Sequence, residues 1–206
     1  MDLPAVISED FGSLLEPHGF QQTKPRFWVR DAKPLIRELF NIYPLKGASY
    51  SVRWGFSLDF VPLMWTKPPR WKRTNKSAHF DLTFEPLDQG SREFVFHHMP
   101  GYDEAERTTI QRIARGSVQR ALSDFDAVKG ISDIPGMFAK FARMPAKRFG
   151  LDNYSQARLA WGLTLMRLGQ IDEARALIAK ACELHRIDVA QLILVRAIAE
   201  ATPPQT

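Results

Sequence analysis

Apolar and polar residues alternate with a period of two in two stretches of the first half of the chain. Between Tyr50 and Val61 every second residue is large and apolar, and the residues between them are mostly polar or small. The same pattern returns between Ser77 and Glu85. Such alternation is typical of a strand with one buried face, so both stretches are predicted to be strands. Shorter apolar runs predict further strands at 27–30, at 35–43 and near 92–98.

The predicted strands follow one another without helices between them, through connections that contain proline or glycine. This order predicts an antiparallel meander with one buried face and one polar face. The run at 35–43 carries apolar residues on both faces, which predicts that both of its faces are covered. A short helix at about Pro4 to Leu15, ended by Pro17 and Gly19, is predicted to precede the sheet.

Downstream of the sheet the apolar residues recur at steps of three and four, which is the period of a helix. Asp103 and Glu106 form a capping-box-like start, and the helix that they predict ends by Gly130. The apolar stripe of this helix consists of Ile110, Ala114, Val118, Ala121 and Phe125. A second, short basic helix is predicted at about Pro135 to Met144, where Pro145 ends it.

The last quarter of the chain has helical character in three segments, at 153–168, 172–184 and 188–201. An aspartate stands at the start of each segment, where its carboxylate is expected to accept hydrogen bonds from unpaired amides. Gly169 is placed to end the first segment in the left-handed conformation. The three aspartates are Asp152, Asp172 and Asp188.

Taken together, the patterns predict an α+β protein. We expect an antiparallel sheet meander packed with helices at 1–130, a basic linker helix at 131–151, and a helical hairpin with a last helix at 152–206. A chain of 206 residues is long enough to bury a core of normal size. Its 45% hydrophobic and 25% charged residues are those of an ordinary globular protein, which excludes the disordered and fibrous classes.

The segment 157–181 resembles a tetratricopeptide repeat. Gly162 and Ala174 are small residues where the two antiparallel helices of such a repeat approach closely, and Leu165, Ile178 and Ala181 are expected to fill the seam. Arg158 and Arg186 stand where the family has an aromatic residue and a proline, and we find no second copy. Because one repeat cannot bury its own face, the hairpin is expected to pack on the sheet domain, the last helix or another subunit.

Three segments of the first half resemble the uncharacterised bacterial domain-of-unknown-function 4304 family. They are 14–20, 27–30 and 54–62, and they match the family in pattern and order more than in specific chemistry. The resemblance spans residues 1–130 and implies an α+β fold without a known activity. It supplies no catalytic residues.

Cys182 is the only cysteine, so neither an intrachain disulfide nor a cysteine-based zinc site is possible within the chain. The first ten residues lack the features of a secretory signal, and no stretch is long and apolar enough to cross a bilayer. We therefore expect a cytoplasmic protein, bacterial by its composition, and predict no cofactor and no metal.

The net charge of +5 is concentrated in one segment, because residues 60–80 contain no acidic side chain. Cations interleaved with aromatic rings suit a single-stranded nucleic acid, whose phosphates pair with the cations and whose bases stack on the rings. The residues that would bind are Trp65, Lys67, Arg70, Trp71, Lys72, Arg73 and Lys76. The alternative, which we favour from the sequence, is a solvated loop that its tryptophans anchor to the sheet.

Two further segments have the composition of sites. His79 and Asp81 are expected to project from the polar sheet face, with Asp59 nearby, as base, orienter or metal ligands. Ordinary cross-strand polar pairs are the favoured interpretation. The segment 137–149 resembles an amphipathic helix for an anionic membrane or a partner groove, although its apolar residues more often belong to a core.

These observations favour a non-catalytic protein that binds a protein partner or itself. The chain lacks a phosphate loop, a nucleophile elbow, a dinucleotide fingerprint and a metal signature, which argues against a standard enzyme. The apolar residues of 192–198 exceed what one hairpin obviously covers, which favours a homodimer. The alternatives are nucleic-acid or polyanion binding through 65–76, and a hydrolase or metal-dependent enzyme at the polar sheet face.

Overall fold

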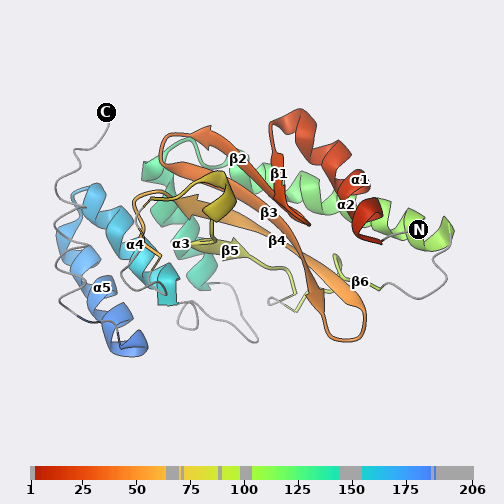
Figure 1. Cartoon of the computed structure of the whole chain (residues 1–206). Coiled ribbons are helices and arrows are strands. Elements are labelled where there is room, and N and C mark those ends of the chain that lie inside the picture. Colours follow the sequence, from red (N-terminus) through yellow and green to blue (C-terminus); the bar gives the residue numbers. More distant parts are fainter. Residues whose placement is uncertain are drawn as a thin grey trace.

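The computed structural model describes residues 3–63, 70, 72–87, 90–97, 104–143, 155–186 and 188. At its centre lies an antiparallel sheet in which the order of the strands in space follows their order in the chain (Figure 1). The strands are β1 (Gln21–Lys24), β2 (Phe27–Lys33), β3 (Ile36–Leu45), β4 (Ser49–Leu58) and β5 (Leu82–Phe84). A short strand β6 (Phe96–His97) also pairs with β4. The predicted α+β class and the predicted meander are confirmed.

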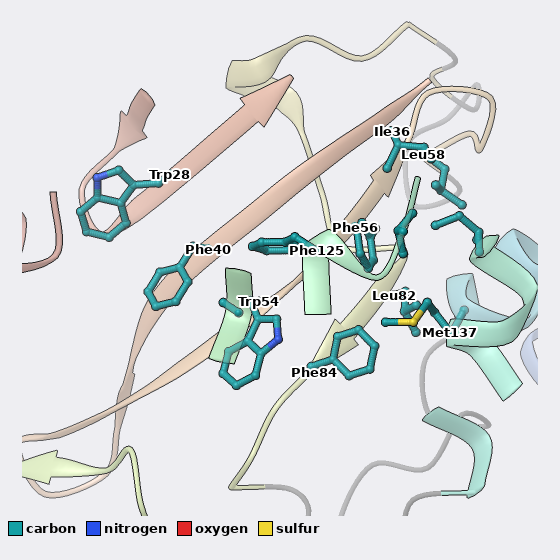
Figure 2. Close-up of a cluster of buried hydrophobic side chains, with 14 of the residues drawn as sticks. Trp28, Ile36, Phe40, Trp54, Phe56, Leu58, Leu82, Phe84, Phe125 and Met137 are labelled. Atoms are coloured by element: carbon teal, nitrogen blue, oxygen red, sulfur yellow. The ribbon is translucent and has the colours of Figure 1, made fainter. Parts of the chain in front are cut away.

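One face of the sheet packs against α1 (Leu3–Leu15) and α2 (Glu104–Asp126). The predicted stripe of α2 is buried along its whole length, and Phe125 makes an edge-on contact with Phe56 at a centroid distance of 5.5 Å. Figure 2 shows Phe125 between Phe40 and Phe56 in this core. Each such fully buried side chain contributes about 1.5–3 kcal/mol to folding. A 3₁₀ turn, η1 (Glu16–His18), follows α1, and Gly19 closes it with a φ of 84°.

The prediction that the second sheet face is polar is wrong for the part of that face that residues 72–81 cover. The segment 72–81, which contains the 3₁₀ turn η2 (Asn75–Ser77), crosses in front of the strands while α2 passes behind them (Figure 1). Ala78 and Phe80 pack on Val29 of β2 and Leu39 of β3 to form a second, smaller apolar cluster. Both faces of β3 are therefore covered, as its apolar pattern predicted.

The predicted strand at 77–85 is reduced to the three residues of β5. The chain bends at Asp81, where its backbone N–H donates to the carbonyl of Phe56 at 2.8 Å, and only beyond that point does it pair along β4. Ala78 and Phe80 therefore lie on one face of the sheet, whereas Leu82 and Phe84 lie in the main core on the other. Within the described residues 92–97 the predicted strand is likewise shorter and consists of β6.

The helical part of the chain contains α3 (Ile134–Arg143), preceded by the 3₁₀ turn η3 (Ile131–Asp133), and the hairpin of α4 (Ser155–Arg167) and α5 (Ile171–His185). Gly169 adopts the predicted left-handed conformation, with a φ of 78°. The prediction that Asp172 caps α5 is wrong. Gln170 occupies the cap position and Asp172 lies within the first turn, where a carboxylate still interacts favourably with the helix dipole. Asp103, Asp152 and the predicted helix after Asp188 lie outside the described residues.

A single apolar cluster connects the sheet with the helical part. Met137 and Phe138 of α3 are buried in it, and the ring of Phe138 stacks on Trp161 of α4 at 5.8 Å. In addition, Gln156 of α4 donates to the carbonyl of Pro62, which follows β4. The described part of α3 is thus a core helix, as the favoured interpretation of its sequence predicted. None of the described helices is both long and apolar enough to cross a membrane.

Candidate functional site

A row of side chains crosses the part of the second sheet face that segment 72–81 leaves open. Strand register places Lys24 of β1 opposite Phe27 of β2, Phe27 opposite Asn41 of β3, and Asn41 opposite Arg53 of β4. Residues that are directly opposite in antiparallel strands project to the same face. Together with Tyr43, His79 and Phe80, this row forms what we call the cation–aromatic face.

Arg53 is the most firmly positioned residue of this face. Its Nε donates a hydrogen bond to Oδ1 of Asn41 at 2.9 Å. Its guanidinium lies 5.0 Å from the ring centroid of Tyr43 and 5.1 Å from that of Phe80. Within the described parts of the chain, no carboxylate lies within ion-pair distance of Arg53. Two aromatic rings and one amide therefore hold a cation whose charge stays available to a ligand.

Lys24 provides a second cation at the edge of the sheet. Its ammonium lies 5.6 Å from the ring centroid of Phe27, which makes an edge-on contact with Phe80 at 5.9 Å. The side chain of Lys24 is exposed, whereas Phe27 and Tyr43 are half-buried. The face thus combines exposed positive charge with partly accessible rings.

His79 reports the electrostatic character of the face. Burial together with the charges of Arg73, Arg53 and Lys24 lowers the pKa of His79 to about 4. The imidazole is therefore neutral at pH 7, and the potential around it is positive. An anion bound here would gain from the same charges that disfavour the imidazolium.

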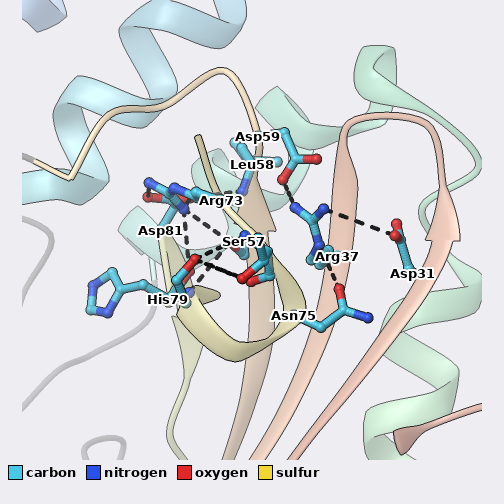
Figure 3. Close-up of polar contacts among 11 residues, drawn as sticks. Asp31, Arg37, Ser57, Leu58, Asp59, Arg73, Asn75, His79 and Asp81 are labelled. Carbon is cyan, nitrogen blue, oxygen red and sulfur yellow. Dashed lines mark hydrogen bonds and ion pairs between the residues drawn. The ribbon is translucent and has the colours of Figure 1, made fainter. Parts of the chain in front are cut away.

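Beneath this face, Arg73 and Asp81 form an ion pair whose side chains are completely buried. Both terminal nitrogens of Arg73 donate to the Asp81 carboxylate, with Nη2 to Oδ1 at 2.9 Å, and Nη1 also donates to the Ser57 hydroxyl at 2.9 Å (Figure 3). The backbone N–H of Leu58 donates to Asp81 Oδ2 at 2.7 Å. Burial raises the pKa of the Asp81 carboxyl, and Arg73 opposes that shift. The pair anchors segment 72–81 to β4.

The three catalytic candidates from the sequence do not converge on one reaction centre. The Asp81 carboxylate is occupied by Arg73, and Figure 3 shows the His79 imidazole directed away from that pair. Asp59 instead pairs with Arg37, whose Nε also donates to Asn75 Oδ1 at 2.8 Å. A carboxylate often orients a histidine that acts as base, but here both aspartates pair with arginines instead.

The residues predicted to bind through the basic loop lie in different environments. Arg73 is an internal ion-pair partner and not a surface cation, because its guanidinium is buried against Asp81. Arg70, Lys72 and Lys76 are exposed, and η2, which carries Lys76, lies against β1 and β2. Lys76 thus adds to the cations on the Lys24 side of the face. Trp65, Lys67 and Trp71 lie outside the described residues.

Comparison of the chain with protein-family models, with curated proteins and with solved structures finds no match. The resemblances to the domain-of-unknown-function 4304 family and to a tetratricopeptide repeat therefore stay predictions. Among the described residues, no three histidine, cysteine or carboxylate side chains group as metal ligands would. What the site can bind has to be argued from its own geometry.

Proposed function

We propose that this is a non-catalytic binding protein whose cation–aromatic face binds a polyanion, with single-stranded nucleic acid as the ligand class that fits best. The observation that supports this most strongly is the fixed, unneutralised guanidinium of Arg53 between two rings. Phosphates would pair with Arg53, Lys24 and Lys76, while bases stack on the half-buried rings of Tyr43 and Phe27. The ligand class is the one considered as an alternative for the basic loop, but the proposed binding surface is the sheet.

The non-catalytic part of the proposal is supported by the way the acidic groups are used. Asp81 and Asp59 both pair with arginines, and each arginine is further fixed by a neighbouring side chain. Carboxylates in such pairs stabilise the fold. They are poor general bases, because transferring a proton to one of them breaks its ion pair. The binding of a protein partner and the formation of a homodimer stay open as predictions.

The proposal is tested by fluorescence anisotropy with a labelled oligo-dT of about ten nucleotides, a length typical of single-stranded sites. With three phosphate contacts, the log–log dependence of affinity on salt should have a slope of about −2. Arg53→Gln should weaken binding about tenfold, since it removes the positioned charge, and Lys24→Gln should reduce the magnitude of the slope by roughly 0.7. The matched control is Arg175→Gln, which removes an exposed positive charge from α5.

Arg53 also holds Asn41 and two rings, so a second variant separates charge from packing. Arg53→Lys keeps the charge but loses the planar fork, and it should retain part of the affinity. Equal affinity of the wild type, Arg53→Gln and Lys24→Gln would refute the proposal, as would binding that does not depend on salt.

A further inference from the structure

A separate cavity of about 170 Å³ lies at the other face of the sheet, where α2 and α3 meet β4 and β5. Its apolar side is made by Trp54 and Phe84, which lie next to each other in Figure 2. Its polar side is made by Arg120, Ser123 and Asp124 of α2 and by Lys140 of α3. Ser123 and Asp124 follow Arg120 by three and four residues, so both lie on the side of the helix that carries Arg120. The cavity shares none of these residues with the cation–aromatic face.

Asp124 holds the polar side in a fixed arrangement. Its Oδ2 accepts a hydrogen bond from the buried indole Nε1–H of Trp54 at 2.9 Å, and its Oδ1 accepts one from Lys140 Nζ at 3.0 Å. The Lys140 ammonium also lies 5.8 Å from the centroid of the Phe84 ring. Lys140 neutralises the only carboxylate among the described residues that line the cavity, and it is itself held in place by two contacts.

Arg120 carries the positive charge that the Asp124 carboxylate does not neutralise. Its nearest acidic partner among the described residues is Glu93 at 3.8 Å, and both side chains are more than half exposed. Such exposed pairs add little to stability, so the guanidinium can turn toward a ligand at small cost. The cavity therefore carries one net positive charge, on a group that can form two parallel hydrogen bonds to a carboxylate.

We propose that this cavity binds a small organic carboxylate whose apolar body is about the size of one ring. A cavity of about 150 Å³ admits benzene, so the observed volume suits a single ring or a branched aliphatic group. Phe84 and Trp54 are only 2% and 1% exposed, so the body would fill the cavity with little contact to their rings and the charged groups would provide most of the affinity. The carboxylate would accept hydrogen bonds from Arg120 and the Ser123 hydroxyl, with Lys140 shared between the ligand and Asp124.

Benzoate is a suitable probe, because it combines a ring with one carboxylate. Its binding is followed by two-dimensional amide NMR on the full chain, in which the indole N–H of Trp54 is a direct reporter. Arg120→Gln and Lys140→Gln should each weaken benzoate binding about tenfold, while Arg112→Gln, an exposed arginine elsewhere on α2, should leave it unchanged. Benzamide, which has the same shape without the charge, should bind at least tenfold more weakly than benzoate.

Several outcomes would overturn the proposal. The first is that the indole N–H signal of Trp54 does not shift at about 10 mM benzoate, a roughly 50-fold excess over the protein. The second is equal binding of benzoate and benzamide. The third is benzoate binding that Arg120→Gln does not change. Tighter binding of benzylamine than of benzoate would assign the cavity to cations, with Lys140 as the group that a ligand replaces. Arg120 and Lys140 are both about half exposed, so their variants should keep the fold, which circular dichroism checks.

Discussion

His79 lies among cations and is itself unable to carry a charge at neutral pH. Three positive side chains and burial act on it together, and they come from three different places in the chain: Lys24 of β1, Arg53 of β4 and Arg73 of segment 72–81. The imidazole therefore senses any change in the electrostatic potential of the cation–aromatic face. A bound polyanion would shield these charges and raise the pKa of His79, so ligand binding and proton uptake should be coupled.

The lowered pKa of His79 predicts how stability depends on pH. The folded protein binds this proton with a pKa of about 4 and the unfolded chain with the ordinary 6.5, so the unfolded chain takes it up first. The contribution is constant above pH 6.5 and is lost as the pH falls from 6.5 through 4, by up to about 3 kcal/mol. His79→Gln should remove this part of the pH dependence, as measured by urea unfolding at pH 7, 5.5 and 4.

His97→Gln is the matched control, because His97 is exposed on β6 and its Nδ1 contacts the Ser49 hydroxyl at 2.7 Å. It removes a histidine that is not part of the cation–aromatic face, so the comparison shows what the loss of a histidine elsewhere does to the measured stability. If the difference in unfolding free energy between the wild type and His79→Gln is the same at all three pH values, His79 does not titrate as described.

At the scale of elements, the α4–α5 hairpin depends on one close approach. A Cβ atom at Gly162 would lie 2.6 Å from Cγ1 of Ile178 and 3.1 Å from the carbonyl oxygen of Ala174. Gly162→Ala should therefore destabilise the protein by about 1–3 kcal/mol through overpacking, even though alanine has the higher helix propensity. Chemical unfolding monitored by circular dichroism measures the change.

Gly136 on α3 is the matched control for this prediction. A Cβ atom there meets nothing within 4 Å, so Gly136→Ala should be neutral or stabilising by up to about 1 kcal/mol. In an Ile178→Ala background, which removes the contacting Cγ1, Gly162→Ala should destabilise the protein less than it does in the wild type. A stabilising Gly162→Ala would contradict the close packing of α4 on α5.

The sequence carries enough information to predict most elements, because each pattern that predicts one arises from local burial. The alternation in β4 and the stripe of α2 both follow from a single apolar surface that each element packs against. What covers the second face could not be predicted. Phe80 and Leu82 are two residues apart, so alternation predicts that they share a face, yet they lie on opposite faces. Gly55 carried a signal that was missed: a Cβ atom there would lie 1.9 Å from the Leu82 carbonyl oxygen, so a mid-strand glycine marks the approach of another chain segment.

The candidate site was less predictable than the fold for a related reason. The sequence places Arg53 on the polar side of its strand, but Lys24, Phe27 and Asn41 join it only through the register of three strand pairs. Register depends on turns and on side-chain packing across the sheet. The period-two pattern shows which residues share a face but not which residues of neighbouring strands lie opposite one another. The burial of Arg73 could not be predicted from the sequence either, because nothing in a basic segment indicates that a carboxylate eight residues later will pair with one of its cations.

At the scale of the whole molecule, the main apolar cluster runs from Ile7 of α1 to Ala181 of α5. The sheet and the hairpin should therefore unfold together, although the sequence predicts separate parts at 1–130 and 152–206. Thermal unfolding followed by tryptophan fluorescence and by far-ultraviolet circular dichroism should give coincident transitions. Gly162→Ala should lower both midpoints equally. Two separate transitions, or a shift of only one, would show that the hairpin is an independent unit.

Segment 72–81 has a consequence for how this protein can be altered. The pair between Arg73 and Asp81 joins the two ends of residues 74–80, so this stretch leaves the sheet and returns to it at a fixed clasp. The clasp is held by Ser57 and Leu58 of β4, and Gln156 of α4 also interacts with the Asp81 carboxylate. The enclosed residues form a cover between two fixed points, in which Ala78 and Phe80 pack on Val29 and Leu39 and have to be kept. New sequences inserted between the two clasp residues would be displayed across the sheet while α1, α2 and the main core stay unchanged.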